Sequence, residues 1–200
     1  MRRAPRPRPG ARLLAPALVV CLGLVAGGCS RGEESAETGP TLAEPSEAPT
    51  LEIEPVTHLG RVTGQLPRKD ARVVEERVST IAVRWLTDAY VGGRYPRETF
   101  DNSFADFSRG ARAAARSDLR VMSNADIGTR VEAITPTRLD VEVDLLAVGK
   151  HAVGSTARVQ TTFRTEGPKK GSYRVSGRLH LTKDDGRWTV FAYHVSKGGR

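Results

Sequence analysis

The chain has 200 residues, a length that favours one ordinary domain over two full ones. Hydrophobic residues make up 38% and charged residues 27% of it, which is not the composition of a fully disordered protein. Its two cysteines exclude a disulfide-rich scaffold, and no Cys and His cluster has metal-ligand spacing. The net charge of +8 is uneven: residues 1–28 carry five Arg and no acid, residues 29–54 one Arg and seven Glu, and residues 55–200 carry 25 basic and 16 acidic side chains.

The first 28 residues have the order of a secretory signal peptide. A basic stretch ending at Arg12 precedes an apolar run from Leu13 to Leu24, and Ala26-Gly27-Gly28 are small. The apolar run is shorter than the ~20 residues that a membrane span needs, which argues against an uncleaved anchor. We therefore expect residues 1–28 to be removed on export.

The segment Leu24-Val25-Ala26-Gly27-Gly28-Cys29-Ser30 resembles a bacterial lipobox. The resemblance implies that Cys29 receives a diacylglycerol and an acyl chain such as palmitate, and two or more chains hold a protein stably on a bilayer. The small residues before Cys29 also suit ordinary signal peptidase, so a secreted protein with one free thiol is the alternative. Because Cys21 lies in the removed segment, the mature chain has no intramolecular disulfide.

Residues 29–67 are predicted to be the lipidated cysteine followed by an acidic tether. Residues 30–54 are rich in Glu, Pro, Ser, Thr, Ala and Gly and contain no aromatic residue, so they cannot bury enough apolar area to offset the cost of ordering. About 25 residues of coil span roughly 25–30 Å, enough to hold a domain clear of lipid headgroups. The folded domain is expected over residues 68–197, with residues 198–200 as a tail.

Helical periodicity opens this domain. Asp70 is the expected N-cap and Gly92-Gly93 the expected stop of a long helix. Its apolar residues recur at spacings of three and four on one face: Val74, Val78, Ile81, Ala82, Trp85 and Ala89. A short helix is expected around Phe100, Phe104 and Phe107. A further helix over residues 109–121 would place Arg112, Arg116 and Arg120 on one face.

From Gly128 onward the hydrophobic period is two, which predicts strands. Four strands are expected around residues 139–145, 158–164, 173–181 and 188–193, and residues 130–135 form the first half of a bent strand. Short turns between them make an antiparallel meander, with Asp184-Asp185-Gly186 as the strongest hairpin signal. One face is apolar, and the other has carboxylates on one strand and arginines on others. The predicted class is α+β, with N-terminal helices packed on a curved four-stranded antiparallel meander.

Three segments carry a resemblance to a known superfamily: Tyr95-Pro96-Arg97, Ser123-Asn124-Ala125-Asp126-Ile127-Gly128, and Asp185-Gly186-Arg187-Trp188 running into Tyr193. Together with helices leading into a meander, they resemble the nuclear-transport-factor-2-like superfamily, whose fold is the cystatin-like roll. In detail they are similar to small actinobacterial envelope lipoproteins and mammalian-cell-entry-associated proteins. The fold hosts isomerases, dehydratases, ligand binders and adaptors, so the resemblance implies a shape rather than an activity.

No catalytic residue, cofactor or metal is predicted. Enzymes of this roll place a carboxylate or His between sheet and helix, and none of the inward-facing residues of the first three strands titrates near neutrality. The weak pocket candidates are Asp88, near the end of the long helix, and His194, in phase with Trp188, Val190 and Ala192. The alternative is that Asp88 faces water and His194 lies at a frayed end.

The expected location excludes nucleic acid as a partner and favours an envelope protein, an anionic lipid or a wall polymer. The candidate contacts for an anionic surface are Arg112, Arg116, Arg120, Lys169 and Lys170, with a solvated helix face as the alternative. The sequence thus predicts a lipid-anchored module on the extracytoplasmic face of the cell membrane that binds or scaffolds without catalysis. The alternative is a small-ligand binder or cryptic enzyme that uses the interior of the roll. A closed core would argue against that alternative, and an open pocket with a titratable group would support it.

Overall fold

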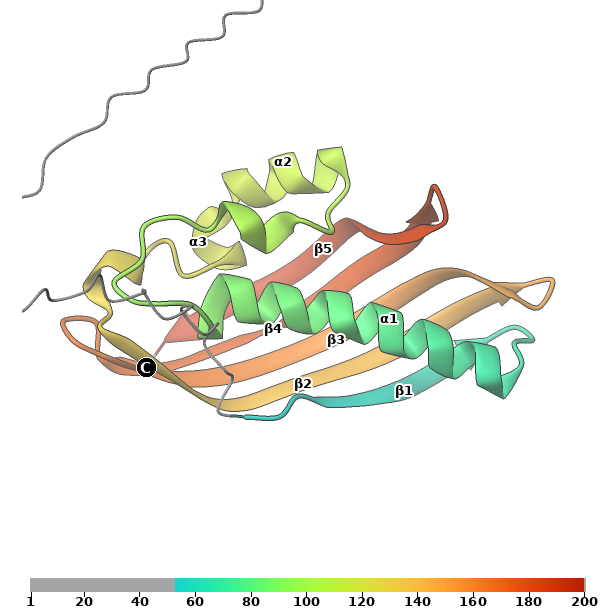
Figure 1. Cartoon of the computed structure of the whole chain (residues 1–200), viewed down its shortest axis with the longest axis horizontal. Helices are drawn as coiled ribbons and strands as arrows, with labels where there is room; N and C mark the ends of the chain where they lie inside the picture. The colour runs from blue at the N-terminus through green and yellow to red at the C-terminus, as the bar shows by residue number, and fades with distance from the viewer. Residues whose placement is uncertain (1–52, 200) are drawn as a thin grey trace, which may run out of the picture. The chain divides into compact units, whose positions relative to one another are not determined.

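The computed structural model describes residues 53–199 and shows a five-stranded sheet with helices packed against one face (Figure 1). The strand order is β1-β2-β3-β4-β5; β2 to β5 are antiparallel neighbours, and β1 is parallel to β2. The predicted α+β class is confirmed. The elements in chain order are β1 (Val56–Thr63), α1 (Arg68–Leu86), η1 (Thr87–Val91), η2 (Asp101–Phe104), α2 (Arg109–Ser117), α3 (Leu119–Met122), η3 (Gly128–Arg130), β2 (Ala133–Val148), β3 (His151–Glu166), β4 (Gly171–Asp184) and β5 (Arg187–Gly199).

Two tight turns fix the predicted meander. Gly149 and Lys150 between β2 and β3 have φ angles of 57° and 66°, and Asp185 and Gly186 between β4 and β5 have φ angles of 48° and 77°. Two consecutive residues with positive φ give a hairpin turn whose twist matches that of its strands. The bend predicted near Pro136 is present as a register shift between Pro136 and Arg138.

A fifth strand, β1, lies in the range that the sequence assigned to the tether, so the predicted count of four strands is wrong and the folded part begins before residue 68. The pairing of β1 with β2 shifts between Leu59 and Val62, and this bulge breaks the period-two pattern that would have revealed a strand. Gly60 sits at the bulge because a Cβ there would lie 2.5 Å from an Asp144 carboxylate oxygen. Only Leu59 and Val62 of β1 pack against the core.

Helix α1 covers the sheet with the predicted apolar stripe. All six stripe residues are buried, and Val78, Ala82 and Ala89 have no exposed surface. The helix starts earlier than predicted, because Pro67 is the N-cap. Asp70 lies in the first turn, where its negative charge interacts favourably with the positive end of the helix dipole. α1 continues into the π-helical turn η1, and the N–H of Gly92 closes this turn on the Thr87 carbonyl at 2.7 Å.

The edge of the sheet at β5 is partly covered by the chain between η2 and α2. Phe107 makes a parallel bridge to Val190, and the Ser108 N–H donates to the Val190 carbonyl at 2.8 Å. The Ser108 hydroxyl then accepts from the Ala111 N–H and caps α2. β5 itself extends to Gly199, which pairs with Tyr173, so residues 198 and 199 belong to the sheet rather than to a tail.

The outer face of the sheet, turned away from α1, carries the predicted cross-strand ion pairs. Arg158 on β3 donates to Glu142 at 2.5 Å and to Asp144 at 2.9 Å, and both acids lie on β2. His58 on β1 lies 3.8 Å from Glu142. These half-exposed pairs are worth little each, but a register slip by one residue would bury the carboxylates of β2.

Candidate functional site

The space between α1 and the sheet is filled by side chains. The inward residues of β2, β3 and β4 belong to one cluster of buried residues together with the stripe of α1. Two buried hydroxyl groups beside this cluster bind backbone: Thr161 donates to the Arg138 carbonyl at 2.8 Å and Ser155 to the Asp144 carbonyl at 2.9 Å. The indole N–H groups of Trp85 and Trp188, which belong to the cluster, have no hydrogen-bond partner within residues 53–199. The hydroxyl of Tyr90, whose pKa burial raises well above its ordinary value, donates to the Val121 carbonyl at 2.5 Å. All three hydroxyl groups are therefore engaged by backbone carbonyls within the fold.

His194, the first weak pocket candidate, is exposed and does not lie on the inward face, so it does not reach Asp88 in the interior. Leu181 pairs with Val190 and His180 pairs with Ala192, which leaves Phe191 as an extra residue in β5. This bulge reverses the alternation after Val190 and turns the His194 side chain to solvent. Tyr193 and Val195 take the inward positions instead and pack on the core.

Asp88, the other weak candidate, does line a hollow, but on the surface of the fold. It lies in η1, and burial raises the pKa of its carboxyl above the ordinary value, with Arg97 and Arg84 acting in the opposite direction. Its side chain makes no ion pair within residues 53–199, while its backbone carbonyl accepts from Arg97 at 2.8 Å. The side chain therefore stays available to a ligand in this hollow.

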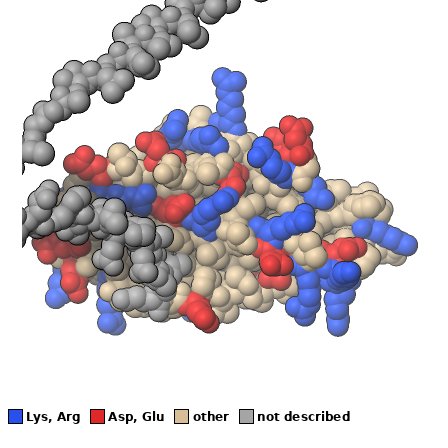
Figure 2. Space-filling view, viewed as in Figure 1, with Lys and Arg blue, Asp and Glu red and all other residues tan. Residues whose placement is uncertain are grey.

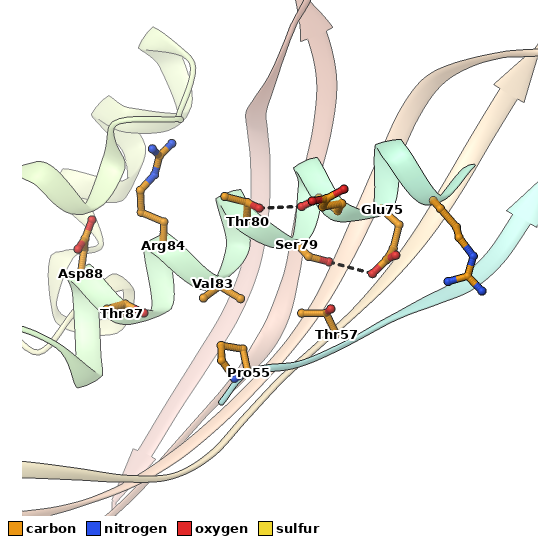
Figure 3. A pocket seen from close by; sticks show the side chains of 11 residues that line it. Pro55, Thr57, Glu75, Ser79, Thr80, Val83, Arg84, Thr87 and Asp88 are labelled. Atoms are coloured by element: carbon orange, nitrogen blue, oxygen red, sulfur yellow. Dashed lines mark hydrogen bonds between the residues drawn. The ribbon is translucent and has the colours of Figure 1, made fainter. Parts of the chain in front are cut away.

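We call the hollow the α1–β1 groove (Figure 3). It has a volume of about 670 Å³ and runs between one flank of α1 and η1 and the first residues of the edge strand β1. Ser79, Val83 and Thr87 on this flank point toward Pro55 and Thr57 (Figure 3). Its lining is Pro55, Thr57, Arg72, Glu75, Glu76, Ser79, Thr80, Val83, Arg84, Thr87 and Asp88.

The groove has an excess of carboxylates. Arg84 is engaged by Asp106, and Glu75, Glu76 and Asp88 form no ion pair within the part of the chain that the structure describes. The Ser79 hydroxyl donates to Glu75 at 3.5 Å, and the Thr80 hydroxyl donates to the Glu76 backbone carbonyl at 2.8 Å (Figure 3). Arg72 also lines the groove and forms no ion pair within residues 53–199, so three carboxylates face one free guanidinium group and the net charge of the lining still favours a ligand with a positive charge.

The predicted arginine stripe is divided between two helices. α2 ends at Ser117, so Arg120 lies on α3 and not on the face that carries Arg112 and Arg116. The Arg112 guanidinium donates to the carbonyls of Phe104, Ala105 and Phe107 at 3.0, 2.9 and 3.2 Å. Arg116 lies 3.5 Å from Asp101. The third predicted contact, Lys169-Lys170, sits in the turn between β3 and β4.

Two of the segments behind the superfamily resemblance meet at one end of the sheet. The Arg97 N–H donates to the Gly128 carbonyl at 2.9 Å, and its guanidinium donates to the Asp88 carbonyl and stacks on Phe100. The Asn124 side chain, fully buried, donates to the Tyr90 carbonyl at 2.7 Å and to the Tyr95 hydroxyl at 3.4 Å. We call segments 95–100 and 123–130, with the end of β5, the loop end. Its polar side chains bind backbone and hold the loops in place.

Lys197 at the loop end was missed by sequence reasoning. Its side chain is 5% exposed and donates to the Ser123 carbonyl at 2.9 Å, to the Arg120 carbonyl at 3.4 Å and to the Asp126 carboxylate. Burial lowers the pKa of its ammonium group, and Asp126 opposes that shift. Lys197 satisfies carbonyls that the end of α3 leaves free, which is a structural task. The bulge at Phe191 reverses the alternation of β5 and so turns the Lys197 side chain inward. The residues around Phe191 contain no sequence signal that predicts this bulge.

Cys29, the predicted signal peptide and residues 29–52 of the tether lie outside the described residues. Within residues 53–199, no group of three or more His, Cys, Asp or Glu side chains could hold a metal ion. No helix in this part of the chain is long and apolar enough to cross a membrane. Compared with protein-family models, curated proteins and solved structures, the chain has no match among any of the three.

Proposed function

We propose that this protein is an exported bacterial lipoprotein, anchored through Cys29 to the extracytoplasmic face of the cell membrane, and that it binds a partner without catalysis. The observation that carries the binding role is the contrast between a filled interior and an open α1–β1 groove of about 670 Å³. The anchor is supported by the order of basic residues, apolar run, small residues and Cys29 at the N-terminus.

We further propose that the domain is a cystatin-like roll of the nuclear-transport-factor-2-like superfamily. The long α1 across a four-stranded antiparallel meander supports this assignment, as do the contacts between segments 95–97 and 123–128. In enzymes of this fold the ligand binds in a cavity between the sheet and the helix. In this protein the inside is packed, so the binding surface moves to the outer flank of the helix.

The occupant that suits the groove is an extended segment of an envelope protein that carries Lys or Arg. β1 is an edge strand, and its first four residues, Val56–Leu59, pair regularly with β2, so an added strand can continue the sheet there. Alternate side chains of such a strand would point toward α1 and enter the groove. The carboxylates of Glu75, Glu76 and Asp88 then select a basic side chain over an acidic one.

The anchor is tested by replacing Cys29 with Ala in the full chain. We expect the protein to leave the membrane fraction for the medium, or to accumulate as an unprocessed precursor. Fractionation and the mass of the mature N-terminus measure both outcomes. Unchanged processing together with unchanged membrane retention would overturn the lipid anchor.

The groove is tested with short extended peptides of matched length whose central residue is Lys, Arg, Asp or Glu. We expect fluorescence anisotropy to show tighter binding of the Lys and Arg peptides, and Thr57→Trp to abolish it by filling the groove. Thr135→Trp, at an exposed position on β2 outside the groove, is the matched control. Equal binding of basic and acidic peptides, or equal loss in both variants, would refute a peptide site here.

A second function has one observation in its favour, which is the raised pKa of Asp88 in a groove large enough for a small molecule. A small amine ligand could pair with this carboxylate. Asp88→Asn would then remove binding of the amine while leaving peptide binding reduced but present. Retained amine binding in that variant would exclude this second function.

A further inference from the structure

The end of the sheet at the β2–β3 turn exposes apolar side chains that the core does not use. Val148 is 63% exposed, Leu146 48% and Val153 41%. Leu146 and Val148 follow the outward phase of β2, and Val153 is the extra residue of a bulge opposite the step from Leu146 to Ala147. Phe191, 52% exposed through its own bulge, lines the same hollow on the outer face as Leu146.

The floor of that hollow is a glycine. Gly154 pairs with Leu146 on one side and with Thr182 on the other, and the space above it measures about 310 Å³. Large apolar side chains that stay exposed around an unfilled hollow mark an interaction surface rather than a packing defect.

Cations surround this apolar surface. The loop between β1 and α1 lies directly against the β2–β3 turn, because a Cβ at Gly64 would come within 2.2 Å of the Ala147 carbonyl oxygen. This contact brings the segment from Arg61 to Lys69 to the same end of the domain as Lys150. Figure 2 shows Lys and Arg side chains projecting from the end of the domain where α1 begins.

These cations are uncommitted. The side chains of Arg61, Arg68, Lys69 and Lys150 make no ion pair or hydrogen bond with any residue from 53 to 199; Arg61 donates only through its backbone N–H, to Asp144 at 2.8 Å. The acids nearby are Asp70 in the first turn of α1, Asp144, which Arg158 already binds, and Asp184 and Asp185 in the neighbouring β4–β5 turn. We call the apolar residues Leu146, Val148 and Val153 together with these four cations the hairpin end.

We propose that the hairpin end rests on the surface of an anionic lipid bilayer, with Val148 and Val153 at the level of the headgroups and the cations against lipid phosphates. Apolar side chains ringed by Lys and Arg are the composition that binds membrane interfaces. Water-exposed Val148 gains an apolar environment there, and the unpaired cations gain counter-ions. The proposal rests on the proposed lipid anchor, since the contact adds to a domain that is already held at the membrane.

The chain length between anchor and domain suits this placement. Residues 30–55 separate Cys29 from β1, and a coil of this length spans about 25–31 Å. The eight residues of β1 extend about 26 Å from the point where the tether joins to the hairpin end. A domain standing on its hairpin end therefore needs no stretching of the tether. This orientation leaves the α1–β1 groove along the side of the domain, open to a partner.

The test uses the acylated full-length protein reconstituted in vesicles of phosphatidylcholine and phosphatidylglycerol at 7:3, or of phosphatidylcholine alone. A polarity-sensitive fluorophore is attached at Val148→Cys and, as the matched control, at Ser172→Cys, an exposed position at the start of β4 near the opposite end. We expect a blue shift and at least threefold stronger quenching by nitroxide lipids at position 148 in the anionic vesicles. Position 172 should show neither effect.

Charge reversal completes the design. Lys150→Glu combined with Arg68→Glu should return the signal at position 148 to that of the control. Equal signals at positions 148 and 172, or a signal at 148 that ignores lipid charge and the double substitution, would overturn the proposal. Flotation and the mass of the N-terminus report the anchor separately. If the protein is acylated and floats with the vesicles but the fluorophore at position 148 shows no shift or quenching, the membrane contact alone is refuted. If the chain is not acylated, the anchor is refuted.

Discussion

The loop end and the hairpin end both carry basic side chains, but these side chains do different things. At the loop end, Arg97 and Lys197 donate to backbone carbonyls and to Asp126. At the hairpin end, Lys150 and Arg68 bind nothing within residues 53–199. A buried cation with several acceptors holds the fold together, and an exposed one beside apolar side chains remains free to bind something else. The net charge of residues 55–200, which is +9, does not distinguish these two roles.

The largest effect is expected for Lys197→Met at the loop end. The substitution leaves the Asp126 carboxylate and the Ser123 carbonyl without their donor. We expect the free energy of unfolding to fall by about 2–4 kcal/mol, because removing one partner of a largely buried ion pair leaves the other uncompensated. Urea denaturation measures this loss. Lys150→Met at the hairpin end is the matched control, with an expected change in the free energy of unfolding below about 0.5 kcal/mol. Similar losses in the two variants would contradict the difference between the two ends.

A smaller loss is expected for Asn124→Ala. Its side-chain amide donates to the Tyr90 carbonyl at 2.7 Å in a fully buried position. The Tyr90 carbonyl then keeps only the longer hydrogen bond from the Tyr95 hydroxyl, at 3.2 Å. Losing the shorter bond should cost about 1 kcal/mol, so the variant should unfold at lower urea with an unchanged dependence on denaturant. A variant as stable as the parent chain would mean that water replaces the amide, and that the loop end is less tightly packed than described.

The pH dependence of stability tests Asp88, whose backbone carbonyl binds Arg97 of the loop end. Burial raises the pKa of its carboxyl, so the folded state binds this proton more tightly than the unfolded chain does. The charged form therefore costs stability at neutral pH, and the cost disappears as pH falls through the raised pKa toward the ordinary value near 3.8. We expect Asp88→Asn to be slightly more stable than the parent at pH 7, with the difference vanishing near pH 3. A variant that is instead less stable than the parent at pH 7, with the deficit disappearing toward acid pH, would show that Arg97 and Arg84 outweigh burial.

The smallest effect on folding is expected at the hairpin end itself. Val148→Ser and Val153→Ser each alter a side chain that is at least 41% exposed, so each should change the free energy of unfolding by less than about 0.5 kcal/mol. Thermal unfolding of the two variants provides the measurement. A loss above 1 kcal/mol in either one would make these residues part of the core and remove the reason to assign them a binding role.

The sequence was informative where one pattern ran without interruption. The stripe from Val74 to Ala89 predicted α1, because burial on one face imposes a fixed period. The turn residues Asp184-Asp185-Gly186 predicted a hairpin. It failed where the backbone inserts an extra residue. The bulge near Gly60 hid β1, and the bulge at Phe191 turned His194 outward and Lys197 inward.

The candidate site was predictable only in part. Asp88 was identified from its place at the end of the helix, but its groove exists because β1 lies opposite α1, and β1 was not expected. Arg112 had the spacing of a surface stripe, yet it turns back onto three carbonyls of its own chain. Periodicity reports which face a residue occupies; it does not report what lies across from that face.

The bulge in β1 also bears on how this protein avoids self-association. An unpaired edge strand is a template on which further copies can stack without limit. Here regular pairing stops after Leu59, and the chain then bends at Gly60, whose position against Asp144 leaves no room for a side chain. An added strand can therefore pair with only four residues of this edge. That length suffices to bind one short peptide segment, and it is too short to nucleate a fibril.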